Sequence, residues 1–189
     1  FVIADQLIDR THGRLGSFFG EGMVAHVSLA DPVCPRLSTL LGDAAEAAGA
    51  KVHRQGCYVA IDGPQFSTRA ESRMYREWGA DVIGMTAMPE ARLAREAELP
   101  YALLAMVTDY DSWRAGEGGV DVAEILAVLA ANVGKAKDTL AMLAKSLPAE
   151  REPSPIDHAL DGAIITAPDR RDPTMVAKLG AVAGRVLES

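Results

Sequence analysis

Residues 56–85 read GCYVAIDGPQFSTRAESRMYREWGADVIGM, and this stretch contains the pattern that decides the fold. The apolar run Gly56–Ile61 predicts a β-strand, and the Gly63-Pro64 pair after it is a turn signal. Thr68–Trp78 reads as a helix and opens on Thr-x-x-Glu, the pattern of a capping box. Asp81–Met85 predicts a second, short buried strand. The stretch therefore predicts a strand–helix–strand unit.

The same alternation of strands and helices continues on both sides of this unit. Further strands are predicted at Phe1–Ile8, Val24–Leu29, Tyr101–Thr108 and Ala163–Thr166. Further helices are predicted at Pro35–Ala48, Pro89–Glu98, Val122–Ser146 and Pro173–Glu188. Strands that alternate with helices of this length favour a three-layer α/β fold with a largely parallel sheet. We interpret residues 1–189 as one domain, or most of one, because no internal repeat or low-complexity tract divides the chain.

The composition excludes several classes of protein. In a chain of 189 residues, 49% are hydrophobic and 24% are charged, which is ordinary for a globular protein. The net charge of −7 argues against a general nucleic-acid binder. No apolar run approaches the roughly 18 residues of a membrane span, so we expect no membrane partner.

The cysteine content and the first residues indicate the setting of the chain. Cys34 and Cys57 are too few for a disulfide framework, and we recognise no signal peptide, so we expect a cytoplasmic protein. The chain opens on the apolar, strand-like residues 1–3 without an initiator Met. We therefore interpret residue 1 as an internal position of a longer gene product.

Two carboxylates follow the apolar run at 101–108, where an α/β sheet binds its ligands. Asp109 and Asp111 are two residues apart, so in extended backbone they face the same way. Close carboxylates in a partly desolvated pocket allow one of them to hold a proton near neutral pH. The protonated one could donate to a ring nitrogen, and the ionised one could accept from an amino group. The alternative is an Asx turn with a helix cap at the end of a strand.

Other polar residues at strand ends also have two interpretations. Met85-Thr86 precedes a helix, and a hydroxyl with free N–H groups at such a terminus suits an anion such as phosphate. The alternative makes Thr86 an ordinary N-cap and Met85 a core residue. Phe66 could stack on a planar ligand or lie in the core, and Ser67 is a plausible helix cap.

A basic cluster lies in the glycine-containing loop near the start of the chain. Arg10, His12 and Arg14 could bind an anion or could form a solvated loop face. The four histidines have no spacing typical of a metal site, so we expect no metal ligands. His26 falls in a predicted strand, where a structural role is the simpler interpretation.

The longer motifs resemble one enzyme family. These motifs are GPQFSTRAE at 63–71, WGADVIGMT at 78–86, Pro89-Glu90 and AMVTDYDSW at 105–113. Together they resemble the 5′-methylthioadenosine phosphorylases of the purine nucleoside phosphorylase family, and the match extends from Phe1 to about Leu147. The resemblance implies a three-layer α/β/α fold with a mixed sheet. It also implies a homotrimer or a dimer of trimers.

The activity that the resemblance implies is phosphorolysis of methylthioadenosine to adenine and 5-methylthioribose 1-phosphate. Inorganic phosphate is then a co-substrate, with no organic cofactor and no metal. In the family, part of the phosphate site lies upstream of the segment that opens this chain, so the N-terminal strands are expected to be absent and residues 1–189 alone to be inactive. Two alternatives stay open: a methylthioinosine or other purine nucleoside phosphorylase, and a non-catalytic remnant that acts as an oligomerisation or binding module.

Residue roles can be transferred from the family position by position. Asp109 and Asp111 are implied to read the purine N7 and the 6-amino edge, and an Asp at this point suits an amino group better than a 6-oxo group. The other residues implied to contact substrate are Phe66 and Ser67 at the base, Met85 at the ribose, Thr86 at phosphate or the sugar, His26 of a neighbouring subunit at the 5′ end, and Val122 and Ile125 at the methylthio group.

Overall fold

A parallel sheet forms the centre of the molecule. The computed structural model describes residues 1–114 and 122–187. Strands β2 (Gln6–Asp9), β3 (Cys57–Ala60) and β4 (Val82–Gly84) pair in parallel in the order β2–β3–β4. Tyr58, the second residue of β3, lies opposite Leu7 on one side and Val82 on the other. Because β3 is the middle strand, its last three residues are buried.

A second, antiparallel pair makes the strand system mixed. β1 (Val2–Ala4) pairs with β5 (Leu103–Ala105), and all three residues of β1 are buried. The expected strand over Phe1–Ile8 is therefore two strands, which change partner at Asp5. The carboxylate of Asp5 accepts a hydrogen bond from the Gly56 N–H at 3.1 Å, so a polar contact fixes this change.

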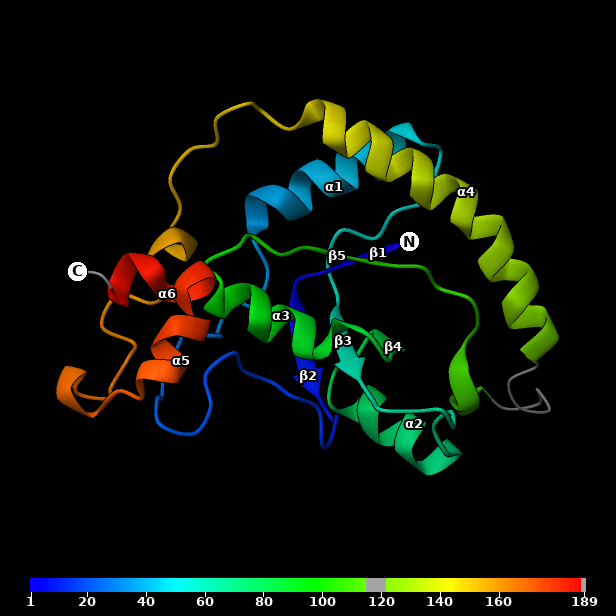
Figure 1. Ribbon diagram of the computed structural model, residues 1–189. Helices are drawn as coiled ribbons and strands as arrows, with labels where there is room; N and C mark the ends of the chain where they lie inside the picture. The colour runs from blue at the N-terminus through cyan, green and yellow to red at the C-terminus, as the bar shows by residue number, and fades with distance from the viewer. Residues whose placement is uncertain (115–121, 188–189) are drawn as a thin grey trace.

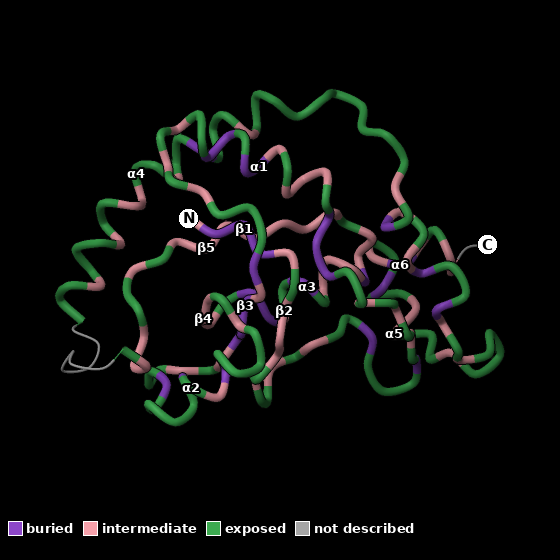
Figure 2. The backbone as a smooth tube through the Cα atoms, turned by 180° about the vertical axis from the view of Figure 1, so that it is seen from behind, coloured by how far each residue is buried: buried purple, intermediate pink, exposed green. Residues whose placement is uncertain are grey.

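Helices lie on both sides of the strands, as the expected three-layer α/β arrangement requires. Figure 1 shows α1 (Pro35–Ala47) and α4 (Val122–Ser146) running together along one side, with α2 (Arg69–Glu77) on the opposite side. α3 (Ala87–Glu96) packs on β3 and contributes to a core cluster. The buried members of that cluster are Ala4, Tyr58, Ala60, Ala87, Met88 and Ala91. In Figure 2 the purple, buried backbone includes β1 and most of β3, whereas β4 and β5 are pink, which means half-buried.

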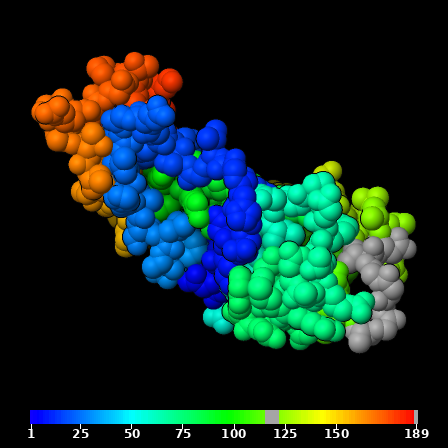
Figure 3. Space-filling model, turned by 90° about the horizontal axis from the view of Figure 1, so that it is seen from below, coloured from blue at the N-terminus to red at the C-terminus, as the bar shows by residue number. Residues whose placement is uncertain are grey.

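The C-terminal part forms a smaller cluster of its own. It contains the short 3-10 turns Pro155–His158 and Pro168–Arg170 and the helices α5 (Pro173–Lys178) and α6 (Gly180–Leu187). Phe19 and Met23, from the long loop after β2, are buried in this cluster. Figure 3 shows the orange and red C-terminal surface directly against that blue loop.

Several expected elements have different limits in the structure. The strands expected at Val24–Leu29 and Ala163–Thr166 are wrong, because only the single bridge between Ala25 and Ile164 forms. Side chains of these segments pack into the C-terminal cluster, which takes the place of an extended ladder. The helix expected at Pro173–Glu188 is interrupted at the buried Leu179.

The strand expected over Tyr101–Thr108 is also shorter than its apolar pattern. Only Leu103–Ala105 is a strand, and its residues are half-buried instead of being covered on both faces. The helices expected at Pro35–Ala48 and Val122–Ser146 are confirmed to within one residue. Within the described ranges, no helix is both long enough and apolar enough to cross a membrane.

Candidate functional site

The turn before α2 is fixed by the capping box that the sequence predicts. Thr68 Oγ1 accepts from the Glu71 N–H at 3.2 Å, and Glu71 Oε2 accepts from the Thr68 N–H at 2.7 Å. These hydrogen bonds, first that of the Thr68 backbone, lower the pKa of Glu71. The cap sets the position of Ser67, which is buried and whose Oγ has no hydrogen-bond partner in the described structure.

The two aspartates are arranged differently from the extended pair that the spacing predicts. β5 ends at Ala105, and Asp111 opens the 3-10 turn η1 (Asp111–Trp113) with a φ of 56°. Asp109 accepts from the Asp111 N–H and from the Thr108 hydroxyl, each at 2.7 Å. The expected Asx turn is therefore present, and the expected extended geometry is wrong. A carboxylate has about four lone-pair sites, so Asp109 can still accept a hydrogen bond from a ligand.

A pocket of about 880 Å³ opens beside these aspartates. Thr108–Asp111 and Trp113 form one wall, and β4 with the segment before it forms another. α2 contributes side chains at intervals of three and four residues, which place them on one helix face. They are Ser72, Tyr75 and Arg76. This helical spacing is the signal by which sequence reasoning, which missed these residues, could have found them.

Aromatic side chains hold the aspartate wall against α2. The Arg76 guanidinium lies 3.7 Å from the centroid of the Trp113 ring, a cation–π contact. Tyr110 meets the edge of the same ring at 6.0 Å between centroids. Ser112 Oγ donates to the Ser67 carbonyl at 2.9 Å, which ties η1 to the start of α2. The pocket thus combines carboxylates with planar rings, a lining suited to a flat heteroaromatic ligand with ring nitrogens.

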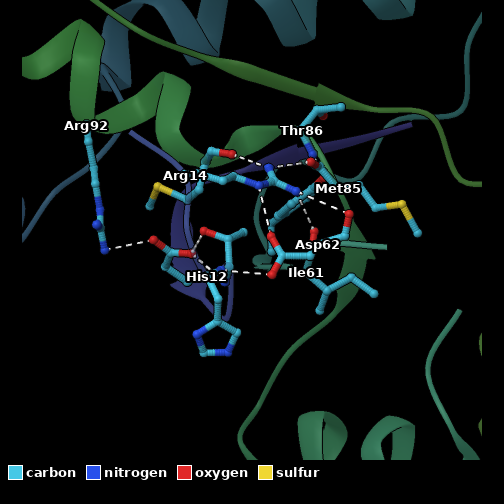
Figure 4. Close-up of polar contacts among 11 residues, drawn as sticks. His12, Arg14, Ile61, Asp62, Met85, Thr86 and Arg92 are labelled. Atoms are coloured by element: carbon cyan, nitrogen blue, oxygen red, sulfur yellow. Dashed lines mark hydrogen bonds and ion pairs between the residues drawn. The ribbon is translucent and has the colours of Figure 1, made fainter. Parts of the chain in front are cut away.

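A second polar cluster lies at the carboxyl ends of β3 and β4 (Figure 4). Thr86 is exposed and is the N-cap of α3, yet its side chain makes no capping hydrogen bond. The Thr86 N–H donates to Tyr58 Oη at 3.4 Å. The Met85 side chain lies against Gly63, where an added Cβ would be 2.5 Å from the Met85 sulfur. With a φ of 71° as well, position 63 requires glycine.

Arg14 belongs to this second cluster, and both of its expected roles are wrong. The side chain is 25% exposed, so it is no solvated loop face. Its guanidinium donates to backbone carbonyls of the neighbouring loops, so it is no free anion ligand. Arg10 lies 5.8 Å from the Trp78 ring, whereas the His12 N–H donates to Asp62 at 2.8 Å.

Of the nine expected site residues, only Asp109 and Asp111 line the aspartate pocket. Ser67, Met85 and Thr86 lie outside it in the turn and the second cluster, and four further residues also lie outside it. Phe66 is 47% exposed, and His26 is exposed beside the C-terminal cluster, with its N–H bonded to the Ala163 carbonyl at 2.8 Å. Val122 and Ile125 lie in the first turn of α4. None of these four lines the pocket of Asp109, and their roles stay predictions.

The described residues offer no metal centre. Among residues 1–114 and 122–187, no group of three or more His, Cys, Asp or Glu side chains could hold a metal ion. Cys34 is buried, as expected of a small core residue, and Cys57 is half-buried. Burial, and then the nearby charge of Asp81, raises the pKa of the Cys57 thiol, so this cysteine is not an activated nucleophile.

Comparison with known proteins places this geometry in a family. A sequence profile described as the phosphorylase superfamily matches residues 1–145. The S-methyl-5′-thioadenosine phosphorylase of Cereibacter sphaeroides is 57% identical over 100% of this chain and 66% of its own length. The enzyme of that name from Bradyrhizobium diazoefficiens is 58% identical over 99% of this chain and 65% of its own. The chain therefore spans about two thirds of the length of these relatives.

Solved structures agree with the sequence comparison. A methylthioadenosine phosphorylase from an Antarctic soil metagenomic library superposes with a TM-score of 0.85 at 42% identity, covering 96% of this chain and 64% of that chain. An adenosine/methylthioadenosine phosphorylase of Schistosoma mansoni superposes with a TM-score of 0.81 at 31% identity, covering 88% of this chain and 67% of that one. With the profile match over residues 1–145, these likenesses show that the chain belongs to the phosphorylase superfamily.

Proposed function

We propose that the protein catalyses phosphorolysis of 5′-methylthioadenosine to adenine and 5-methylthioribose 1-phosphate. The observation that carries the proposal is the pair Asp109 and Asp111 on the wall of a pocket that also contains Trp113 and Tyr110. A purine presents a ring nitrogen, N7, beside its 6-amino group, and two neighbouring carboxylates match that edge. The names of the relatives support the same substrate.

The proposed chemistry separates charge at the glycosidic bond. As that bond breaks, positive charge develops on the sugar and negative charge on the purine. A protonated Asp109 donates to N7 and neutralises the leaving group, and Asp111 accepts from the 6-amino group. The hydrogen bonds from Thr108 and the Asp111 N–H hold the Asp109 carboxylate in a single orientation, which leaves it aimed without reorganisation during the reaction.

Phosphate is proposed to bind at the second cluster and to attack the sugar. The uncapped start of α3 presents the Thr86 hydroxyl, and the N-terminus of a helix favours an anion. Met85 would lie against the ribose, and Phe66 and Ser67 would border the base. The buried Ser67 Oγ, which has no partner within the described residues, supports a polar contact at this point. No organic cofactor or metal is part of the proposal, since phosphate supplies both the nucleophile and the counter-charge.

The proposal includes an assembly. His26 would meet the 5′ end of a substrate bound by a neighbouring subunit, and its exposure outside the aspartate pocket is compatible with that role. Val122 and Ile125, three residues apart on α4, would form the apolar wall at the methylthio group. A cytoplasmic homotrimer or dimer of trimers would supply this arrangement.

Adenosine is a second candidate substrate. The Schistosoma mansoni neighbour bears adenosine in its name together with methylthioadenosine. The test uses the natural protein, at the length its gene encodes, with methylthioadenosine, adenosine and methylthioinosine in the presence and absence of phosphate. We expect phosphate-dependent release of adenine, with kcat/KM highest for methylthioadenosine. Release that does not require phosphate, or a preference for methylthioinosine, would contradict the proposal.

A further inference from the structure

The Arg14 side chain uses every donor it has on the loops at the strand ends. A guanidinium carries five N–H donors, and the structure shows five acceptors. Nε donates to Asp62 Oδ1 at 3.0 Å, and Nη2 donates to the carbonyls of Ile61 and Asp62. Nη1 donates to the carbonyls of Met85, at 2.8 Å, and Met88. No donor remains for a bound anion, so a direct phosphate contact would require breaking one of these bonds.

Four of the five acceptors come from the loops after two strands, and the fifth, the Met88 carbonyl, lies in the first turn of α3. Arg14 itself comes from the loop after a third strand. Ile61 and Asp62 directly follow β3, and Met85 directly follows β4. Arg14 lies five residues beyond the last residue of β2. One side chain thus connects the carboxyl ends of all three parallel strands, which is the edge where α/β sheets bind ligands (Figure 4).

The loop that carries Arg14 is itself anchored. Asp9 Oδ1 accepts from the N–H and the hydroxyl of Thr11, at 2.9 and 2.7 Å. Asp9 Oδ2 forms an ion pair with Arg92 at 2.7 Å. The His12 N–H donates to the Asp62 carboxylate that Arg14 also contacts. Because these contacts hold the loop that carries Arg14 in place, Arg14 can fix the positions of the loops to which it donates.

The segment held by Arg14 has little regular structure of its own. Met88 has non-helical backbone angles, φ −117° and ψ 134°, inside the first turn of α3. Thr86 has no side-chain capping bond, and its N–H makes only a long hydrogen bond of 3.4 Å to Tyr58 Oη. The two Arg14 bonds to the carbonyls of Met85 and Met88 bracket Thr86 on both sides. The backbone on both sides of Thr86 is thus held by a side chain from a distant part of the sequence.

We propose that Arg14 is a positioning residue that sets the Met85–Thr86 segment for phosphate and ribose without touching either. The role in catalysis rests on the proposed function, which assigns phosphate to Thr86 and ribose to Met85. Arg14 makes no contact with the aspartate turn, so it acts on one half of the site only. Lysine cannot replace it, because an ammonium group lacks the planar fork that reaches several carbonyls at once.

The test is Arg14→Lys in the natural protein, with Arg92→Lys as the matched control. Arg92 is an arginine of the same cluster whose ion pair with Asp9 a lysine can keep, so Arg92→Lys makes the same substitution while the anchor of the Arg14 loop is retained. In Arg14→Lys we expect the KM for phosphate to rise about 10-fold and kcat to fall about 10- to 100-fold, the usual cost of a misplaced reacting group. The Kd of adenine, measured by calorimetry, should not change. In Arg92→Lys all three quantities should stay within about twofold.

Two further measurements keep the outcome decisive. Hydrogen exchange of the amides at 85–90 should be faster in Arg14→Lys than in the wild type and in Arg92→Lys, whatever reaction the protein catalyses. If Arg14→Lys does not fold, Asp62→Ala, which removes the side-chain acceptor of Arg14 Nε and leaves the backbone carbonyl bonds, should raise the phosphate KM about threefold. Unchanged exchange at 85–90, or equal losses of affinity for adenine and phosphate, would overturn the positioning role. A wild type without phosphorolysis would instead overturn the proposed function, and the exchange measurement alone would then decide the role of Arg14.

Discussion

Arg14 and Arg185 each connect distant parts of the chain through their guanidinium groups, but they bind different kinds of acceptor. Arg14, at the strand ends, bonds mainly to backbone carbonyls and to one carboxylate. Arg185, on α6, bonds only to carboxylates, those of Glu98 at 2.5 and 2.9 Å and of Asp161 at 2.6 Å. The first arrangement fixes the course of main-chain loops. The second joins the C-terminal helices to the end of α3 by charge.

The two arrangements differ in what perturbs them. Carbonyl acceptors carry no proton that titrates, so the four bonds from Arg14 to carbonyls persist over a wide pH range. The C-terminal junction depends on ionised carboxylates. Burial opposes ionisation of Glu98, but the hydrogen bonds from Arg185 and the Leu160 N–H outweigh it and lower the pKa of Glu98. The comparison therefore predicts that the Arg14 bonds to carbonyls at the proposed site depend little on pH. The junction at Arg185, which lies away from the proposed site, should weaken in acid.

The largest expected effect is the loss of Asp109 in the strand-end region. Asp109→Ala should lower kcat about 10²- to 10⁴-fold, the usual range for a general acid, because protonation of the leaving group matters most in the transition state. The measurement is steady-state kinetics with methylthioadenosine, together with the melting temperature. Asp161→Ala is the control, since Asp161 is an aspartate of the C-terminal junction. A comparable loss of kcat in Asp161→Ala would contradict the claim that catalysis depends on the strand-end region and not on the C-terminal junction.

The Asp109→Asn variant tests whether Asp109 recognises the edge of the purine. An amide can donate to a 6-oxo group, so the ratio of kcat/KM for methylthioadenosine to that for methylthioinosine should fall. If this ratio stays fixed, Asp109 does not read the purine edge. Asp109 then has only a structural role, as the acceptor in the Asx turn to Asp111.

A smaller effect is expected from the helix cap beside Ser67. Thr68→Ala removes the acceptor of the Glu71 N–H and should destabilise the protein by about 1 kcal/mol, which is about 2–4 °C in melting temperature. Thr68→Ser, which keeps the hydroxyl, is the control and should recover most of the loss. Equal melting temperatures for wild type and Thr68→Ala would show that the cap contributes nothing to stability.

The smallest effect at neutral pH is expected at Glu98, and its sign depends on pH. The folded-state pKa of Glu98 lies below its ordinary value of 4.5, so its stabilisation is complete above that pH and is lost as pH falls further. Glu98→Gln should melt about 1–3 °C below the wild type at pH 7, and this gap should narrow below pH 4.5. Melting curves from pH 3 to 8 measure the gap. A gap that widens in acid would contradict the assignment, and kcat at pH 7 should not change.

Much of the architecture could be predicted from residues 56–85. The apolar runs, the glycine-proline turn and the Thr68–Glu71 cap indicate a strand–helix–strand unit, and the structure confirms each part. Local signals suffice here because strand, turn and cap preferences act over a few residues. The expected strand at Val24–Leu29 is wrong for the opposite reason: Ala25 and Val27 pack in the distant C-terminal cluster, and only the bridge from Ala25 to Ile164 forms there.

The sequence by itself determined the family and the α/β alternation, and it marked Asp109, Asp111, Met85 and Thr86 as candidate site residues after strands. It could not determine that Asp111 turns back to donate to Asp109, because that depends on where β5 ends. Nor could it show that Arg14 binds carbonyls 47 to 74 residues away in the chain. The residues next to an arginine in a loop do not indicate whether its guanidinium faces solvent or packs inside the protein. Only the convergence of three parallel strands at one edge supplies the carbonyls that decide between the two.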